Sequence, residues 1–124
     1  LKMGMSLIQG RRLDKNIIGD PIAHELTTQT GISNIEGTVA IARLEPGTGS
    51  AAYFFINIGN NDFLDTGGLR NPDGQGYATF ARVTHGMDIV RKIQSMDTSA
   101  SSDDAVTQGQ ILTAPVIINR AYRK

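Results

Sequence analysis

One short stretch of the chain holds most of its aromatic residues. Four of the seven Phe and Tyr residues lie between Tyr53 and Phe63, although aromatic residues make up only 6% of the sequence. The run YFFIN at 53–57 combines aromatic and β-branched side chains, which favours a β-strand. Successive strand residues point to opposite faces, so one of Phe54 and Phe55 packs inward and the other points outward, where a ligand could bind. The stretch therefore predicts an aromatic-walled surface pocket on a β scaffold.

The remaining chain alternates short apolar segments with turns. Apolar and β-branched residues predict strands at 3–9, 22–25, 37–43, 53–58, 77–83 and 110–122. Pro115 indicates that the last of these is an edge strand or carries a bulge. The pattern predicts one mostly β domain over residues 1–124, a barrel or sandwich with helical caps.

One segment has helical periodicity, and the connections are rich in turn residues. Met87, Val90 and Ile93 are spaced to lie on one face of a helix at 85–96. Polar residues, Gly and Pro predict a loop or an irregular turn at 27–36, loops at 45–50 and 59–75, and a mobile loop at 97–108.

Composition excludes several classes of function. The formal net charge is zero and there is no basic block, which argues against nucleic acid as a partner. No apolar run is long enough to predict a membrane span. The absence of Cys excludes disulfides, thiolate catalysis and Cys-based zinc sites, and weakly suggests an oxidising compartment.

Common cofactor and metal motifs do not fit either. The run GTGSAA at 47–52 matches a dinucleotide fingerprint, but a strand is predicted after it where the fingerprint needs a helix. His24 and His85 have no partner at a spacing suited to a metal site or a catalytic triad. The sequence predicts no cofactor and no metal.

Gln9 is the remaining polar candidate. It ends a predicted apolar strand just before Gly10, where its amide could point into a groove. Considered alone, it is better explained as an ordinary edge residue, just as the aromatic residues considered alone could all be core.

The motifs taken together resemble the cyclophilin family of peptidyl-prolyl cis-trans isomerases. The matching segments occur in the family's order, at 7–10, 37–43, 53–57, 63–65, 77–83 and 86–90. The resemblance extends over 7–122 and implies an eight-stranded antiparallel β-barrel with capping helices. Segments 22–32 and 69–76 resemble a bacterial branch that is often exported, which favours a periplasmic or secreted protein over a cytoplasmic one.

The resemblance also implies catalytic and socket residues. Gln9 takes the position of the family's groove glutamine, and Phe55 is its predicted catalytic partner. Leu7, Phe55 and Leu64 take the positions that form the apolar socket for the proline ring.

Further positions border the implied groove. Ala42 and Arg43 match the backbone segment that hydrogen-bonds an extended peptide. Phe63 matches a position often held by Trp, and Tyr77 one often held by His. Tyr53 lies in the substrate-binding strand.

Four departures accompany the resemblance. Ser6 stands where a socket Phe is usual, Tyr53 where a Gln orients the catalytic arginine, and Arg11 where a Gly is usual. The family's catalytic arginine lies upstream of Gln9 and is not in this chain. We therefore expect the chain to be the C-terminal portion of the domain, without the first strands and first helix.

The predicted function is rotation of X-Pro peptide bonds in protein substrates. The implied partners are proline-containing peptides, unfolded proteins and cyclosporin-like ligands. One alternative is a non-catalytic module that binds proline segments as a chaperone or scaffold does, which the departures would favour. Another is an unrelated β-barrel carrier whose aromatic residues are only core.

Overall fold

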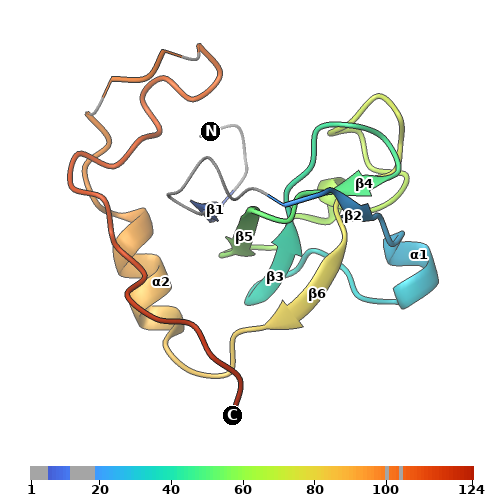
Figure 1. The fold of residues 1–124 in the computed structure, drawn as a ribbon, viewed down its shortest axis with the longest axis horizontal. Helices are drawn as coiled ribbons and strands as arrows, with labels where there is room; N and C mark the ends of the chain where they lie inside the picture. The colour runs from blue at the N-terminus through green and yellow to red at the C-terminus, as the bar shows by residue number, and fades with distance from the viewer. Residues whose placement is uncertain (1–5, 12–18, 100, 104) are drawn as a thin grey trace.

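The main body of the molecule is a four-stranded antiparallel sheet (Figure 1). The computed structural model describes residues 6–11, 19–99, 101–103 and 105–124. The sheet has the order β1-β5-β3-β6, with β1 at Leu7–Arg11, β5 at Tyr53–Asn57, β3 at Thr38–Ile41 and β6 at Thr79–Arg82. The mostly β prediction is confirmed. The predicted strand at 3–9 is found from Leu7 onward, and residues 3–5 lie outside the described residues.

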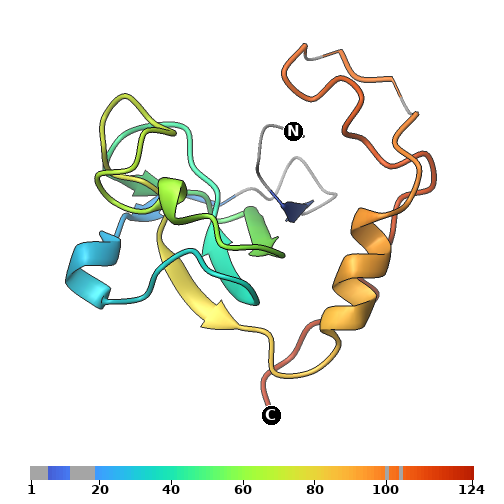
Figure 2. The same cartoon turned by 180° about the vertical axis from the view of Figure 1, so that it is seen from behind.

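A second, two-stranded sheet lies on the side of the main sheet away from α2 (Figures 1 and 2). It pairs β2 (Ile22–Ala23) with β4 (Thr48–Gly49). The prediction of a loop throughout 45–50 was wrong at β4. Gly49 lies so close to Ile41 and Ile22 that a Cβ on it would approach Ile41 Cγ2 to 2.9 Å. The glycine therefore allows the small sheet to pack closely on the main one.

Two α-helices flank the strands. The helix α1 (Thr27–Thr30) occupies part of 27–36, so the prediction of a loop there was wrong at these four residues. It ends at Gly31, whose φ of 72° is left-handed and whose N–H donates to Thr27 O at 2.8 Å. The predicted helix at 85–96 is confirmed as α2 (Met87–Gln94), which buries Val90. Its Gln94 Nε2 donates to Ser6 Oγ at 3.0 Å, which ties α2 to the start of β1.

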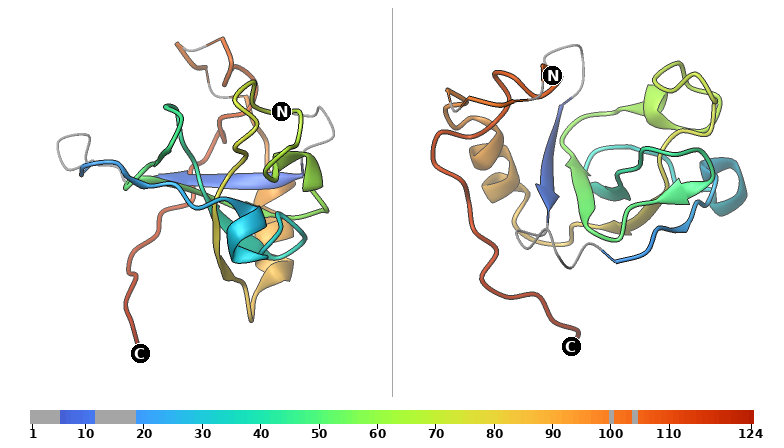
Figure 3. Two further views of the ribbon diagram at one scale, coloured as in Figure 1. Left: turned by 90° about the vertical axis from the view of Figure 1, so that its right-hand side faces the viewer. Right: turned by 45° about the horizontal axis from the view of Figure 1, so that its top comes forward.

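The C-terminal segment has no strand. The predicted strand at 110–122 was wrong: only Ile111 makes an isolated β-bridge, and the segment runs along the α2 side of the molecule (Figure 3). Val116, Ile117 and Ile118 have high strand propensity but are 48–61% exposed. Propensity favours a strand only where a neighbouring edge supplies hydrogen bonds and packing, and none of Val116–Ile118 is assigned to a strand among the described residues. No helix among the described residues is long and apolar enough to cross a membrane.

Candidate functional site

The register of the main sheet places the predicted residues of β1 and β5 on one face. Gln9 in β1 lies directly opposite Phe55 in β5, and Phe55 lies opposite Ala40 in β3. Residues directly opposite in a sheet share a face, so these three form a row across three strands. Tyr53 and Arg11 form the next pair on the same face. Gln9 is exposed and Tyr53 is half-buried.

Two residues of this row, Phe55 and Ala40, belong to an apolar cluster. Phe55 and Leu64 are only 3% and 1% exposed, and they form its centre together with Ala40. The half-buried residues packed against it are Leu7, Ala42, Phe63 and Tyr77. The structure thus brings together six of the nine predicted site residues, and Gln9 and Tyr53 lie on the same sheet face.

The two neighbouring Phe residues lie on opposite faces of β5, as the strand pattern predicts. Phe55, the predicted socket residue, is the inward one, and its ring meets the edge of Tyr77 at 85° with 5.4 Å between centroids. Phe54 is half-buried on the other face, where it covers Gly10 in β1. A Cβ on Gly10 would lie 2.6 Å from the Phe54 ring, so the glycine makes room for it. The inward Phe is therefore the one that the resemblance assigns to the socket, and the outward Phe54 lies on the opposite face of the sheet.

The short 3₁₀ helix η1 (Asp62–Leu64) presents Phe63 and Leu64 to the cluster. Buried amides hold it in place. Asn61 Nδ2, just before η1, donates to Asn57 Oδ1 in β5 at 2.8 Å. Asn57 Nδ2 donates to Asn34 Oδ1 at 3.2 Å and to Thr38 Oγ1 in β3 at 3.0 Å.

Asn34 extends this network to Tyr77. Its Nδ2 donates to Asp65 Oδ1 at 2.8 Å and to Tyr77 O at 3.1 Å. Tyr77 N also donates to Leu64 O at 2.9 Å. These amides were not predicted from the sequence. The available signal was Asn57 itself, a polar residue at a buried position of the predicted strand, which requires hydrogen-bonding partners.

Arg43 is the second anchor of this region. Its side chain is completely buried and forms a two-pronged ion pair with Asp73, Nη1 to Oδ2 at 2.8 Å and Nη2 to Oδ1 at 2.7 Å. These bonds, helped by Gln75 N, lower the pKa of Asp73 to about 2. The guanidinium also lies 5.7 Å from the centre of the Tyr77 ring. The sequence analysis assigned Arg43 by its backbone and did not foresee this use of the side chain.

The predicted peptide-pairing segment is partly occupied. Ala42 N donates to Tyr53 O at 3.1 Å, and Ala42 O accepts from Ser50 N at 2.9 Å. Arg43 has no comparable backbone hydrogen bond to another described residue. If a peptide pairs here, the free backbone groups are therefore those of Arg43.

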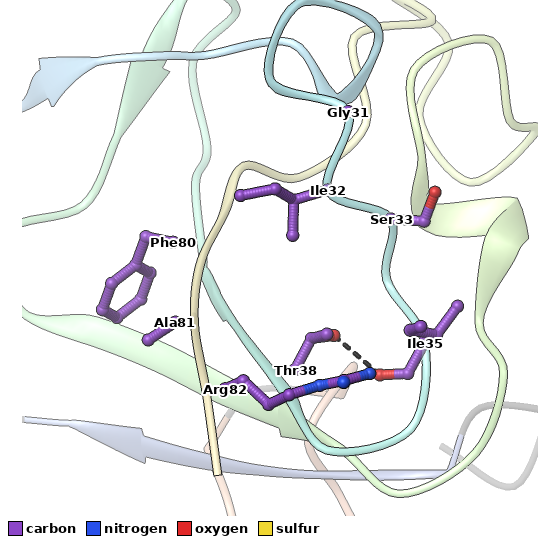
Figure 4. A pocket seen from close by; sticks show the side chains of 8 residues that line it. All are labelled: Gly31, Ile32, Ser33, Ile35, Thr38, Phe80, Ala81 and Arg82. Atoms are coloured by element: carbon purple, nitrogen blue, oxygen red, sulfur yellow. Dashed lines mark hydrogen bonds between the residues drawn. The ribbon is translucent and has the colours of Figure 1, made fainter. Parts of the chain in front are cut away.

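A shallow hollow of about 410 Å³ lies elsewhere, between the loop after α1 and β6 (Figure 4). Its apolar side chains are Ile32, Ile35, Phe80 and Ala81, and Arg82 borders it. None of the nine predicted site residues lines it. The candidate site is therefore a face of the sheet and not this hollow.

The chemistry available on the candidate face is that of binding. It offers apolar and aromatic surface, one exposed amide at Gln9 and backbone groups near Arg43. Among the described residues, no group of three or more His, Asp or Glu side chains could hold a metal ion. Such a face suits an apolar ring in an extended peptide.

Comparison with known proteins agrees with this description. Residues 5–119 match the model of the family described as cyclophilin type peptidyl-prolyl cis-trans isomerase/CLD. The chain is 42% identical over 82 residues to peptidyl-prolyl cis-trans isomerase B of Escherichia coli (strain K12), covering 66% of the chain and 48% of that protein. It is 37% identical over 101 residues to peptidyl-prolyl cis-trans isomerase cyp18 of Streptomyces antibioticus, covering 82% of the chain and 57% of that protein.

A third relative is a peptidyl-prolyl cis-trans isomerase of Acinetobacter baylyi (strain ATCC 33305 / BD413 / ADP1). It is 35% identical over 97 residues, covering 75% of the chain and 48% of that protein. The chain spans about half the length of the curated relatives it matches.

Proposed function

This chain belongs to the cyclophilin-type peptidyl-prolyl cis-trans isomerase family, and from that premise we propose that its sheet face binds X-Pro segments of protein substrates and accelerates their cis–trans rotation. The observation that carries the proposal is the pairing of Gln9 with Phe55, whose side chain packs in one cluster with Leu64 and Tyr77. The row places an exposed amide beside an apolar surface, and a prolyl peptide needs both.

The reaction requires no bond to be broken. Resonance keeps the peptide bond planar, and rotation costs about 18–20 kcal/mol. The two X-Pro isomers differ by only about 0.5–1 kcal/mol, so the catalyst must lower the barrier without shifting the equilibrium. In the twisted state the prolyl nitrogen regains its lone pair. A donor directed at that nitrogen binds the twisted state more tightly than either planar state.

We assign roles on this basis. The half-buried side chains of Leu7, Phe63 and Tyr77 receive the proline ring, supported from below by the buried Phe55 and Leu64, while the Gln9 amide holds the rotating carbonyl. On the family resemblance, the donor for the prolyl nitrogen is expected to be an arginine on the strand upstream of Gln9. Proline-containing peptides and unfolded proteins are the proposed substrates.

A second candidate function is supported by one observation. Tyr53, which replaces the glutamine that orients the family's arginine, lies beside Gln9 on the binding face. A face altered there could bind proline segments without rotating them.

Exchange NMR on an Ala-Pro peptide, with catalytic amounts of the full-length protein, separates the two functions. Faster cis–trans exchange supports the isomerase. Line broadening at higher protein concentration without faster exchange indicates binding only and overturns the proposed activity.

A pair of glutamine variants then tests the site. Gln9→Ala is expected to lower kcat/KM by about tenfold, the value of one hydrogen bond of about 1.4 kcal/mol in the transition state. Gln29→Ala is the matched control, because Gln29 is exposed on α1 and lies off the binding face. Equal activity of the two variants would show that Gln9 is not part of the site.

A further inference from the structure

A buried arginine requires a structural explanation. The Arg43 side chain has no exposed surface, and desolvation of a guanidinium is costly unless its hydrogen-bond donors are satisfied. A buried ion pair is also weak evidence for stability, because apolar side chains of similar volume often stabilise a fold as well. Another reason for a charge at this position is the geometry that its planar group imposes.

Arg43 uses three donor nitrogens of its guanidinium at once. Nη1 and Nη2 bind the two carboxylate oxygens of Asp73, and Nε donates to Gly76 O at 2.7 Å. The same group lies over the Tyr77 ring. The fork thus fixes the positions of Asp73, Gly76 and Tyr77 relative to β3, with the direction as well as the distance of each bond defined.

The ion pair is backed by a second set of bonds around Gln75. Asp73 Oδ1 accepts from Gln75 N at 2.9 Å, and Gln75 Oε1 accepts from Gly47 N at 2.7 Å. Gln75 O accepts from Thr66 Oγ1 at 3.0 Å and lies 3.1 Å from His24 Nε2. The loop at 66–76 is therefore bonded to the residues that follow β2 and β3, His24 and Arg43, and to Gly47 before β4.

This arrangement bears on the candidate site through Tyr77. Tyr77 directly follows Gly76, and its ring packs in a T-shaped arrangement with the ring of Phe55. Rotation of that ring or a shift of the loop would change the surface on which a proline ring rests. The hydrogen bonds of the Arg43 side chain to Asp73 and Gly76 are called the lock below. The backbone groups that remain free to pair with a peptide belong to the same residue.

We propose that the Arg43 side chain is a positioning residue for substrate binding: clamped by Asp73 and Gly76, it holds Tyr77 against Phe55 and fixes the backbone that an extended proline peptide pairs with. This inference rests on the proposed function. It predicts that loss of the lock weakens peptide binding and leaves the rate of the bound peptide nearly unchanged, as expected for an interaction equal in ground and transition states.

The test uses Asp73→Asn and Arg43→Lys in the full-length protein. The first keeps size and loses the carboxylate, and the second keeps charge and loses the fork. Peptide Kd is measured by chemical-shift titration with an Ala-Pro peptide, and KM and kcat by exchange NMR. Each variant is expected to raise Kd and KM by about tenfold and to change kcat by less than about twofold.

Coupling and a control make the result specific. The Kd of the double variant is expected to be no higher than that of the single variant with the larger loss of affinity, because both substitutions remove the same lock. Arg91→Lys is the matched control: it alters the ion pair of α2 with Glu36, which is half exposed and contains no predicted site residue. It is expected to leave Kd unchanged.

A spectroscopic readout distinguishes the lock from a general loss of stability. The Arg43 Nε–H that donates to Gly76 O is expected to give a side-chain ¹⁵N–H signal protected from exchange, and Asp73→Asn is expected to shift it. Folded variants with unchanged Kd, or a wild-type Nε–H without protection, would overturn the positioning role. Peptide binding without catalysis in the wild type would overturn the isomerase proposal alone, because the Kd comparison still tests the lock.

Discussion

Neither of two long segments, 59–78 and the described part of 95–124, contains a β-strand, yet they are held in different ways. The first is bonded to the rest of the molecule. Asn34 donates to Asp65 and Tyr77, and Arg43 clamps Asp73 and Gly76. In the second, bonds such as Thr113 N to Asp97 O at 2.8 Å and Ser99 N to Thr113 Oγ1 at 2.9 Å stay within the segment.

The contrast shows that order in a loop comes from the partners it meets. Segment 59–78 covers the apolar cluster and borders the candidate site, and its backbone is hydrogen-bonded to the side chains of Thr27, Asn34 and Arg43. Segment 95–124 keeps apolar side chains such as Val106 and Tyr122 more than 60% exposed. Local opening should therefore cost much more free energy in the first segment than in the second.

The largest expected effect comes from Phe55→Ala, which removes the support beneath the first segment. Phe55 is 3% exposed, and truncation of a buried Phe costs about 3–5 kcal/mol of unfolding free energy. Activity should fall by about tenfold or more, since the loss of about 1.4 kcal/mol of binding in the transition state already gives that factor. Denaturant unfolding and exchange NMR measure the two losses.

Hydrogen exchange shows where the Phe55→Ala damage lies. The N–H of Tyr77, bonded to Leu64 O, should lose protection, and the N–H of Thr113 should keep whatever protection it has. Phe80→Ala is the control, because Phe80 is 53% exposed at the hollow and should cost less than half as much. Equal losses from the two substitutions would contradict the assignment of Phe55 to the core.

A matched pair of glycines gives the next effect. Gly76 in the first segment and Gly109 in the second both have positive φ, 67° and 75°, so alanine at either position bears a left-handed strain of about 1–2 kcal/mol. A Cβ at Gly76 would also lie 2.4 Å from Leu64 O, whereas one at Gly109 would meet nothing within 4 Å. Gly76→Ala should therefore be about 1–3 kcal/mol more destabilising than Gly109→Ala in chemical unfolding. Equal costs would mean that the first segment yields as easily as the second.

A smaller effect should appear in acid. The hydrogen bonds and charge of Arg43, with Gln75 N and more weakly His24, lower the pKa of Asp73 from 3.8 to about 2. A depressed carboxyl pKa stabilises the fold fully above the unfolded value, and the contribution is lost as pH falls from about 3.8 toward 2. Asp73→Asn should lower stability at neutral pH, and its difference from wild type should shrink toward pH 2. Glu36→Gln is the control. A difference in stability between wild type and Asp73→Asn that does not vary with pH would contradict the role of the Asp73 carboxylate.

Local sequence patterns correctly predicted the strands and helices that depend on neighbouring residues. The alternation in β5 and the spacing of Met87, Val90 and Ile93 in α2 are properties of neighbouring residues, and both elements are found. The same logic failed for Val116–Ile118, because propensity does not say whether a partner edge is present. The family resemblance supplied the predicted site residues; the sheet register places those in β1 and β5 on one face, and six of the nine belong to the apolar cluster or pack against it.

The long-range side-chain bonds of Asn57 and Arg43 could not be predicted from the sequence. Asn57 meets Asn34 across 23 residues, and Arg43 meets Asp73 across 30. Nothing in the sequence around either partner specifies the other, because the pairing depends on how β3, β5 and the loop at 66–76 come together. Polar residues inside an apolar strand indicate only that some partner is required.

The smallest expected effect lies at the end of the second segment. Tyr122 is 66% exposed, and the Arg120 guanidinium lies 4.6 Å from its ring centre. An exposed cation–π contact contributes about 0.5–1 kcal/mol at most, and it is formed between residues of the same short stretch. Because this contact ties the segment to nothing else, Tyr122→Ala should change the free energy of unfolding by no more than about 0.5 kcal/mol, as for most surface substitutions. Denaturant unfolding measures it, and a loss comparable with that of Gly76→Ala would show that this segment packs on the molecule after all.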